Sequence, residues 1–142
     1  MYMYKEFDLC ITDFSNDNEP GDYWYDCAVI ESAEILSKFN ESDWACLFNE
    51  LAHKSIFWKT RLVECLGDLK NSHELDIILA LIDTDNYDLF ISCVDSLRAM
   101  DICDLSEDDL GKINDKIYHL EQNASLPVKS ILESFSRKFK CK

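Results

Sequence analysis

A pattern of five residues recurs four times along the chain, and its spacing constrains the fold more than any other feature of the sequence. Each copy has two apolar residues, one carboxylate, one small residue and one further apolar or small residue. The copies begin 33, 31 and 38 residues apart and read VIESA at 29–33, LVECL at 62–66, CVDSL at 93–97 and ILESF at 131–135. Repeats of about 30 to 40 residues are typical of two-helix units that bury their apolar faces only against neighbouring units. The spacing therefore predicts an all-α protein, a short α-solenoid of helical pairs.

Apolar residues at helical spacing extend this prediction to most of the chain, as about seven helices joined by short turns. The segment 75–100 shows the unit best, with a helix, an aspartate-containing turn at 83–86 and a second helix. Residues of the types that cap helix N-termini stand at several predicted starts, among them Asp22, Asn71 and Ser106. The expected helices cover residues 22–39, 42–51, 56–69, 71–82, 87–100, 106–120 and 125–139.

The first 21 residues fit the helical pattern less well. Tyr2 and Tyr4, followed by Phe7, Leu9 and Ile11, alternate with other residues as in a strand, but one strand has no partner in this chain. We therefore expect residues 1–21 to form an N-terminal extended arm on the helices or to be partly disordered. Residues 22–142 are then a single α-helical repeat domain.

The composition narrows the class of protein. Of the 142 residues, 47% are apolar, which is enough for a hydrophobic core, and only three are glycine and two proline. No apolar run approaches the roughly 18 residues of a membrane span, and the N-terminus lacks the pattern of a secretory signal. The seven cysteines never form C-x-x-C, so they indicate neither a zinc ribbon nor a disulfide framework. We expect a cytoplasmic protein in a reducing compartment.

Acidic residues outnumber basic ones by 28 to 14, and the excess lies near the N-terminus, where residues 1–50 hold twelve carboxylates and two lysines. Such a field repels nucleic acids and anionic membranes and attracts basic partners. The densest stretch, DFSNDNEPGDYWYD at 13–26, combines aromatic residues with Asp13, Asp17, Glu19, Asp22 and Asp26. Aromatic anchors beside charges are typical of protein interfaces, although a soluble protein can also be acidic for solubility alone.

The direction of the repeated carboxylates follows from a helical wheel. With about 100° per residue, Glu64 lies opposite the apolar side of its helix, and the same arithmetic turns Glu31, Asp95 and Glu133 away from the core. Stacked helices would align the four carboxylates as an acidic ridge. The alternative is a solvated face, on which Asp95 pairs with Arg98, and Glu133 with Lys129 or Arg137. The wheel also places Trp24 opposite the core side, where it is either an exposed anchor or covered by the N-terminal arm.

Residues with the chemistry of catalysis or metal binding do not form recognisable sets. His53, His73 and His119 are far apart, and no Gly-rich phosphate loop or nucleophile motif is present. The run DTDNYD at 83–88 lacks the glycine and glutamate that an EF-hand loop requires. The basic tail 136–142 has charges that complement a helix dipole. We expect no enzymatic activity, no catalytic residue, no metal, no cofactor and no direct binding of nucleic acid or membrane.

The stretch 75–100 resembles a HEAT-type repeat, and the resemblance extends over 56–135. The size, charge and repeat character of the chain, with WKTRLVECLGDL at 58–69 and SLRAM at 96–100, resemble HEAT-like immunity proteins of bacterial polymorphic toxin and contact-dependent growth-inhibition systems. The resemblance implies a cytoplasmic antitoxin that binds one cognate toxin domain, typically a basic nuclease acting on RNA or DNA, and blocks its active site or substrate groove. The partner-binding residues that we expect are Asp13, Asp17, Glu19, Asp22, Trp24, Asp26, Glu31, Glu64 and Asp95.

Two alternatives remain open. One is a HEAT-like scaffold or adaptor in a multiprotein complex, which would use exposed apolar strips rather than carboxylates. The other is an adaptor similar to HEAT-like lyase subunits that handle a chromophore or cofactor, and Arg61 near Cys65 is its one indication in the sequence.

Overall fold

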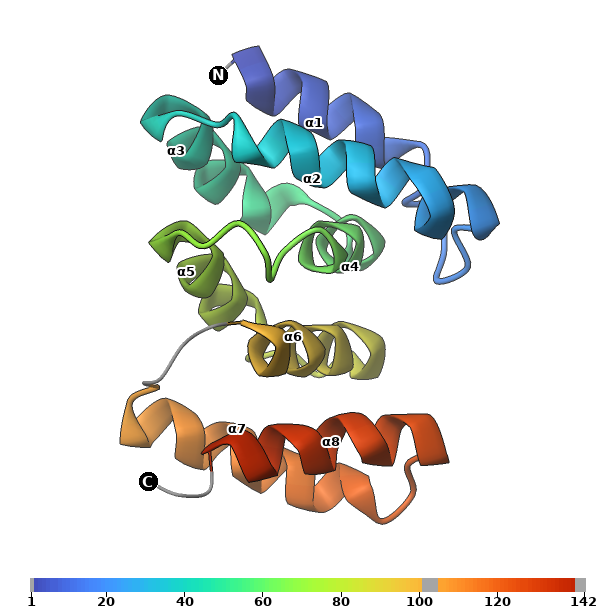
Figure 1. The fold of residues 1–142 in the computed structure, drawn as a ribbon, viewed down its shortest axis with the longest axis vertical. Helices are drawn as coiled ribbons and strands as arrows, with labels where there is room; N and C mark the ends of the chain where they lie inside the picture. Colours follow the sequence, from blue (N-terminus) through green and yellow to red (C-terminus); the bar gives the residue numbers. More distant parts are fainter. Residues whose placement is uncertain (1, 101–104, 140–142) are drawn as a thin grey trace.

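The computed structural model describes residues 2–100 and 105–139, and the regular structure in these two ranges is helical throughout (Figure 1). The described ranges contain eight α-helices, so the all-α prediction is confirmed and the predicted number of seven is one too low. The helices are α1 (Tyr2–Thr12), α2 (Val29–Ser37), α3 (Glu41–Glu50), α4 (Ile56–Glu64), α5 (Ser72–Leu81), α6 (Tyr87–Ala99), α7 (Glu107–Glu121) and α8 (Leu126–Phe139). A π-helical turn, η1 (Trp24–Ala28), leads into α2, and a 3₁₀ turn, η2 (Leu51–His53), follows α3.

The helices are arranged along the long axis of the molecule in roughly the order of the chain (Figure 1). Helix α1 packs against α2, α3 and α4 at one end, and α7 packs against α8 at the other. Between these ends, α4 contacts α6, α5 contacts α6, and α6 contacts α8. Helices α4, α6 and α8 therefore form a continuous line of packing through the molecule.

The core follows this line. Leu62 and Val63 of α4, Cys93 and Val94 of α6 and Leu132 of α8 are completely buried. These residues belong to three of the four pentads, whose apolar positions are core positions as predicted. The first pentad differs: Ile30 is 64% exposed, whereas Ser32 is completely buried.

The N-terminal residues correct the prediction of an extended arm. Residues 2–12 form helix α1, which buries Tyr4, Phe7 and Ile11 and exposes Tyr2 and Leu9. The buried residues are three and four positions apart, which is the spacing of one helical face. The apparent strand alternation depended on the two exposed residues. Residues 2–12 are thus part of the helical core, and residues 13–21 connect α1 to the segment that leads into η1.

Side-chain caps fix most helix starts. Asn71 and Ser106 accept hydrogen bonds from the backbone N–H groups of Glu74 and Asp109, as predicted. The predicted start at residue 42 is one residue late, because Asn40 caps α3 in a reciprocal capping box with Asp43 and the helix begins at Glu41.

None of the helices in the described ranges is both long enough and apolar enough to cross a lipid bilayer.

Candidate protein-binding surface

Residues 13–26, here called the acidic segment, connect α1 to α2 at one edge of the molecule (Figure 1). Its carboxylates are all exposed, and none forms an ion pair with another described residue; they are Asp13, Asp17, Glu19, Asp22 and Asp26. The segment is nevertheless anchored, because the Asn18 side chain donates a 2.8 Å hydrogen bond to Asp88 at the start of α6. All five predicted carboxylates of this stretch therefore lie on its solvent-exposed surface, and the stretch is anchored to α6.

Trp24 lies inside this surface rather than on it. Its side chain is completely buried, and the ring of Phe14 in the acidic segment lies 5.3 Å from it. The wheel that turned Trp24 outward assumed a regular α-helix from residue 22, but η1 is a π-helical turn, which changes the angle between successive side chains. The residues that face solvent here are its neighbours Tyr23 and Tyr25, which are 59% and 53% exposed.

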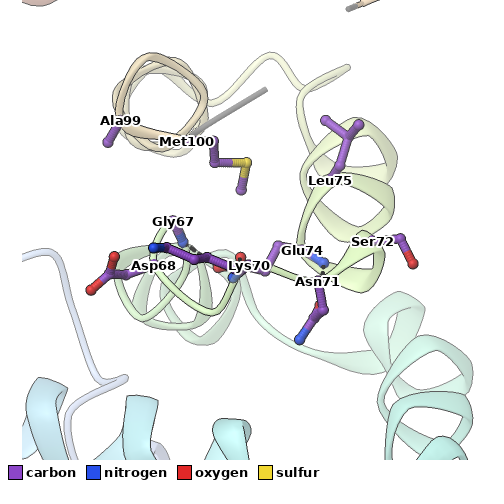
Figure 2. Close-up of a pocket in the computed structure, with 9 residues that line it drawn as sticks. All are labelled: Gly67, Asp68, Lys70, Asn71, Ser72, Glu74, Leu75, Ala99 and Met100. Carbon is purple, nitrogen blue, oxygen red and sulfur yellow. Dashed lines mark hydrogen bonds between the residues drawn. The ribbon is translucent and has the colours of Figure 1, made fainter. Parts of the chain in front are cut away.

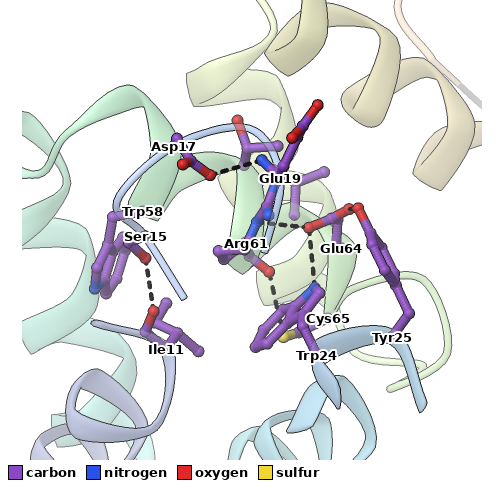
Figure 3. A network of polar contacts seen from close by, with 12 residues as sticks. Ile11, Ser15, Asp17, Glu19, Trp24, Tyr25, Trp58, Arg61, Glu64 and Cys65 are labelled. Atoms are coloured by element: carbon purple, nitrogen blue, oxygen red, sulfur yellow. Dashed lines mark hydrogen bonds and ion pairs between the residues drawn. The ribbon is translucent and has the colours of Figure 1, made fainter. Parts of the chain in front are cut away.

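A polar network beneath the acidic segment holds η1 on α4 (Figure 3). The Trp24 indole N–H donates to Glu64 Oε1 at 3.2 Å, and the Tyr25 hydroxyl donates to Glu64 Oε2 at 3.1 Å. The Arg61 guanidinium pairs with the same carboxylate, with Nε 2.8 Å from Oε1. The prediction that Glu64 points to solvent is therefore wrong, since its side chain is 20% exposed. The reason is that η1 covers the side of α4 that the wheel left open.

The sequence analysis did not predict that Arg61 is the buried ion-pair partner of Glu64. Its side chain is 2% exposed, its guanidinium lies 6.0 Å from the Trp24 ring centroid, and its Nη1 has no hydrogen-bond partner. The detectable signal was its i, i+3 spacing to Glu64.

Burial dominates the electrostatics of the network. It raises the pKa of Glu64 above its ordinary value, although the Arg61 charge and the hydrogen bonds from Tyr25 and Trp24 act in the opposite direction. Burial and the neighbouring Glu64 carboxylate raise the pKa of Tyr25. The thiol of Cys65, which donates to the Arg61 carbonyl at 3.3 Å, also has a pKa well above the ordinary one because it is buried. Such a thiol is protonated and chemically inert at neutral pH.

The four pentad carboxylates do not form one continuous ridge lining a single hollow. Asp95 pairs with Arg98 at 2.6 Å, as the sequence predicted, and its side chain is 48% exposed. Glu64 and Asp95 line one hollow, whereas Glu31 and Glu133 are exposed and do not belong to its lining. Glu133 forms no ion pair among the described residues.

Another hollow, of about 440 Å³, lies between the turn after α4 and the end of α6 (Figure 2). The buried carboxylate of Glu74 borders it, but this group already accepts hydrogen bonds from the backbone N–H groups of Gly67, Leu69 and Lys70. Its lining also includes Met100, the last residue of the first described range. We assign it no ligand.

Within the described residues, no group of three or more His, Cys, Asp or Glu side chains could hold a metal ion. His73 contacts Glu41 at 3.2 Å and stacks on Trp44. Comparisons of the chain with protein-family models, with curated proteins and with solved structures give no match.

Proposed function

We propose that the protein is an immunity protein that binds a cognate toxin domain, a basic nuclease acting on RNA or DNA, and occludes its active site or substrate groove. The observation that carries this proposal is the acidic segment, whose fourteen residues hold five exposed carboxylates that form no ion pair with any other described residue. Clustered charge that no intramolecular partner neutralises is available to a partner of opposite charge.

Physical chemistry supports this kind of partner. The chain has a net charge of −14, and a surface of one sign accelerates association with a protein of the other sign, especially at low salt. Tyr23 and Tyr25 add exposed rings between the carboxylates, and tyrosines are frequent anchors of protein interfaces. The Tyr25 hydroxyl is held on Glu64 of α4, and the Tyr23 ring stacks on Phe14, so little conformational entropy is lost when a partner binds.

We further propose that the helices form a HEAT-like solenoid of helical pairs. The sequential packing of α4 on α6 and of α6 on α8 supports this arrangement, because solenoid repeats contact mainly their neighbours. A solenoid of this kind would present the acidic segment at the edge of an elongated binding surface. The cytoplasmic location expected for an antitoxin is part of the same proposal.

The second candidate is a scaffold or adaptor in a multiprotein complex. Tyr2 and Leu9 favour it, because both lie on the exposed side of α1, seven residues apart, and are 74% and 75% exposed. Such a strip would bind an apolar partner surface with little dependence on salt.

The test requires a partner, so the first step is to read the neighbouring frames for a large secreted protein, whose C-terminal domain is then the one to use. We would measure growth rescue on co-expression and the dissociation constant at low salt. In the segment variant, Asp13, Asp17, Asp22 and Asp26 become Asn and Glu19 becomes Gln. In the scattered control variant, five exposed carboxylates elsewhere are neutralised in the same way, namely Glu34, Asp68, Asp76, Asp115 and Glu133.

The proposal predicts that the segment variant binds at least about tenfold more weakly than the wild type and that the scattered variant changes affinity about twofold or less. No rescue and no binding by the wild type would overturn it. Binding that survives in the segment variant but is lost when Tyr2 and Leu9 become Ser would instead establish the apolar strip of α1 as the interface.

A further inference from the structure

A hollow of about 420 Å³ opens beside the acidic segment, where three elements meet. Tyr25 of η1, Val29 of α2 and Glu64 at the end of α4 line it, together with Leu66 just after α4 and residues of α6. The α6 residues that matter here are Asp95 and Arg98, the ion pair described above. The hollow thus combines apolar walls with two carboxylates.

The carboxylates of the hollow have spare capacity to accept hydrogen bonds. Each carboxylate oxygen can accept two. Asp95 Oδ1 accepts from Arg98 Nε at 2.6 Å, and Oδ2 has no hydrogen bond among the described residues. Glu64 Oε2, which accepts from the Tyr25 hydroxyl, has one position left. A donor that entered the hollow would therefore find acceptors from two helices.

The two carboxylates of the hollow are neutralised by arginines that differ in burial. Arg61 neutralises Glu64 from within the core and is 2% exposed, so it cannot leave without unfolding the site. Arg98 neutralises Asp95 from the surface, and its side chain is 37% exposed. Exposed ion pairs of this kind contribute only about 0–1 kcal/mol, so Arg98 can be displaced at little cost. When Arg98 leaves, the hollow acquires a net negative charge.

We propose that this hollow receives an arginine side chain of the bound partner, which replaces Arg98 on Asp95. The aliphatic part of that side chain would pack between Val29 and Leu66, and its guanidinium would pair with Asp95 and donate a hydrogen bond to Glu64 Oε2. Arg98 shows that Asp95 already accommodates a guanidinium. The proposal rests on the proposed function, because a basic partner supplies the arginine. It adds one specific contact to the long-range electrostatic attraction of the acidic segment.

The full chain itself is suited to the test. Each tryptophan gives a separate indole N–H signal in a ¹⁵N correlation spectrum, and the indole of Trp24 donates to Glu64, a residue of the hollow. The indole of Trp58 donates to Asp8 instead and does not line the hollow, so it is an internal control. The probe is N-acetyl-arginine-N-methylamide, and its neutral control is the citrulline analogue, which has the same shape without the charge.

The proposal predicts a saturable shift of the Trp24 signal with the arginine probe and little or none with the citrulline probe. Arg98→Ala, which removes the internal competitor, is expected to tighten binding about threefold, and Asp95→Asn to weaken it about fivefold. Arg137→Ala and Glu133→Gln, which change exposed charges on α8, should leave the affinity unchanged. Equal shifts with both probes, or weaker binding in Arg98→Ala, would overturn the proposal.

The affinities of the segment variant and of Asp95→Asn for the toxin domain distinguish a failure of the arginine site from a failure of the proposed function. If the segment variant weakens binding to the toxin domain and Asp95→Asn does not, the immunity function stands and the arginine site is wrong. If the hollow binds the arginine probe as predicted but neither the wild type nor any variant binds the toxin domain, the site stands and its partner is another basic protein.

Discussion

Arg61 carries a positive charge at a position with almost no access to water, and one carboxylate, Glu64, is its counter-ion within the described residues. The Trp24 ring, 6.0 Å from the guanidinium, adds a cation–π contact. Burying an ion pair costs free energy that the mutual attraction only partly offsets, and the raised pKa of Glu64 is a sign of that cost. What the pair provides is position, because Glu64 also binds Trp24 and Tyr25 and so orients η1.

We predict that Arg61→Met lowers the free energy of unfolding by about 2 kcal/mol at pH 7, since it leaves Glu64 partly buried without a counter-ion. Without the Arg61 charge, the folded-state pKa of Glu64 rises further above its value in the unfolded chain. A carboxyl group with a raised folded-state pKa loses stability as the pH rises through that interval, so the cost should be largest near neutral pH and smaller near roughly pH 5. Urea denaturation at both pH values measures it.

The matched control is Arg98→Met, which removes the other i, i+3 ion pair of an arginine, with Asp95. That pair is exposed, and its loss should cost less than about 1 kcal/mol at either pH. The double variant Arg61→Met with Glu64→Gln should recover much of the stability and lose the dependence on pH. Equal losses in the Arg61 and Arg98 variants would show that burial does not matter for the Arg61 pair.

At the scale of elements, the turn after α4 is fixed by backbone geometry and by one buried carboxylate. Gly67 and Lys70 have positive φ values of 120° and 58°. Glu74, 2% exposed, accepts hydrogen bonds from the backbone N–H groups of Gly67, Leu69 and Lys70. These features end α4 at Glu64, five residues before the predicted end of that helix. The turn also places α5 beside α6, so that α4 and α5 both pack against α6.

We predict that Gly67→Ala destabilises the protein by about 1–3 kcal/mol, because a φ of 120° is strained for any residue with a Cβ atom. A Cβ atom at this position would meet the Ser96 carbonyl at an ordinary 3.8 Å, so the loss would reflect backbone strain and not a clash. Thermal or urea unfolding measures it.

Gly111 offers the control, since it lies inside α7 with no atom within 4 Å of an added Cβ. Gly111→Ala should stabilise the protein by up to about 1 kcal/mol, because alanine favours a helix over glycine. If Gly67→Ala were neutral, the positive φ of this turn would not be required for folding.

The same elements show how far sequence could predict the fold and the site. Regular apolar periodicity predicted α3, α5, α6, α7 and α8 to within one residue at each end, because burial of one face decides both the period and the packing. It failed where the backbone departs from a regular helix. A regular wheel could not decide whether Trp24 is exposed or covered by the N-terminal residues; the structure shows it buried beside Phe14 in a π-helical turn, Trp24–Ala28, that no residue of the turn signals. The burial of Glu64 depends on packing between η1 and α4, which no local pattern of residues 56–69 contains.

At the scale of the whole molecule, the net charge and its location have separate consequences. The four ion pairs of lysine or arginine among the described residues involve Asp8, Glu64, Asp95 and Asp108, and His73 contacts Glu41. All of these carboxylates lie outside the acidic segment. Self-repulsion in the folded state depends on the total charge of −14. Attraction of a basic partner depends on where the unpaired charge lies. Stability and association should therefore respond differently to the same number of neutralised carboxylates.

We predict that the segment variant and the scattered variant, which both leave a net charge of −9, gain similar stability over the wild type at low salt, about 1 kcal/mol or less. The gain should vanish near 0.15 M salt, where the screening length is about 8 Å. Unfolding curves at low salt and at 0.15 M salt measure both effects. The rate of association with the toxin domain should fall in the segment variant alone. A stability gain confined to the segment variant would contradict this account, because it would place the repulsion within residues 13–26 rather than in the molecule as a whole.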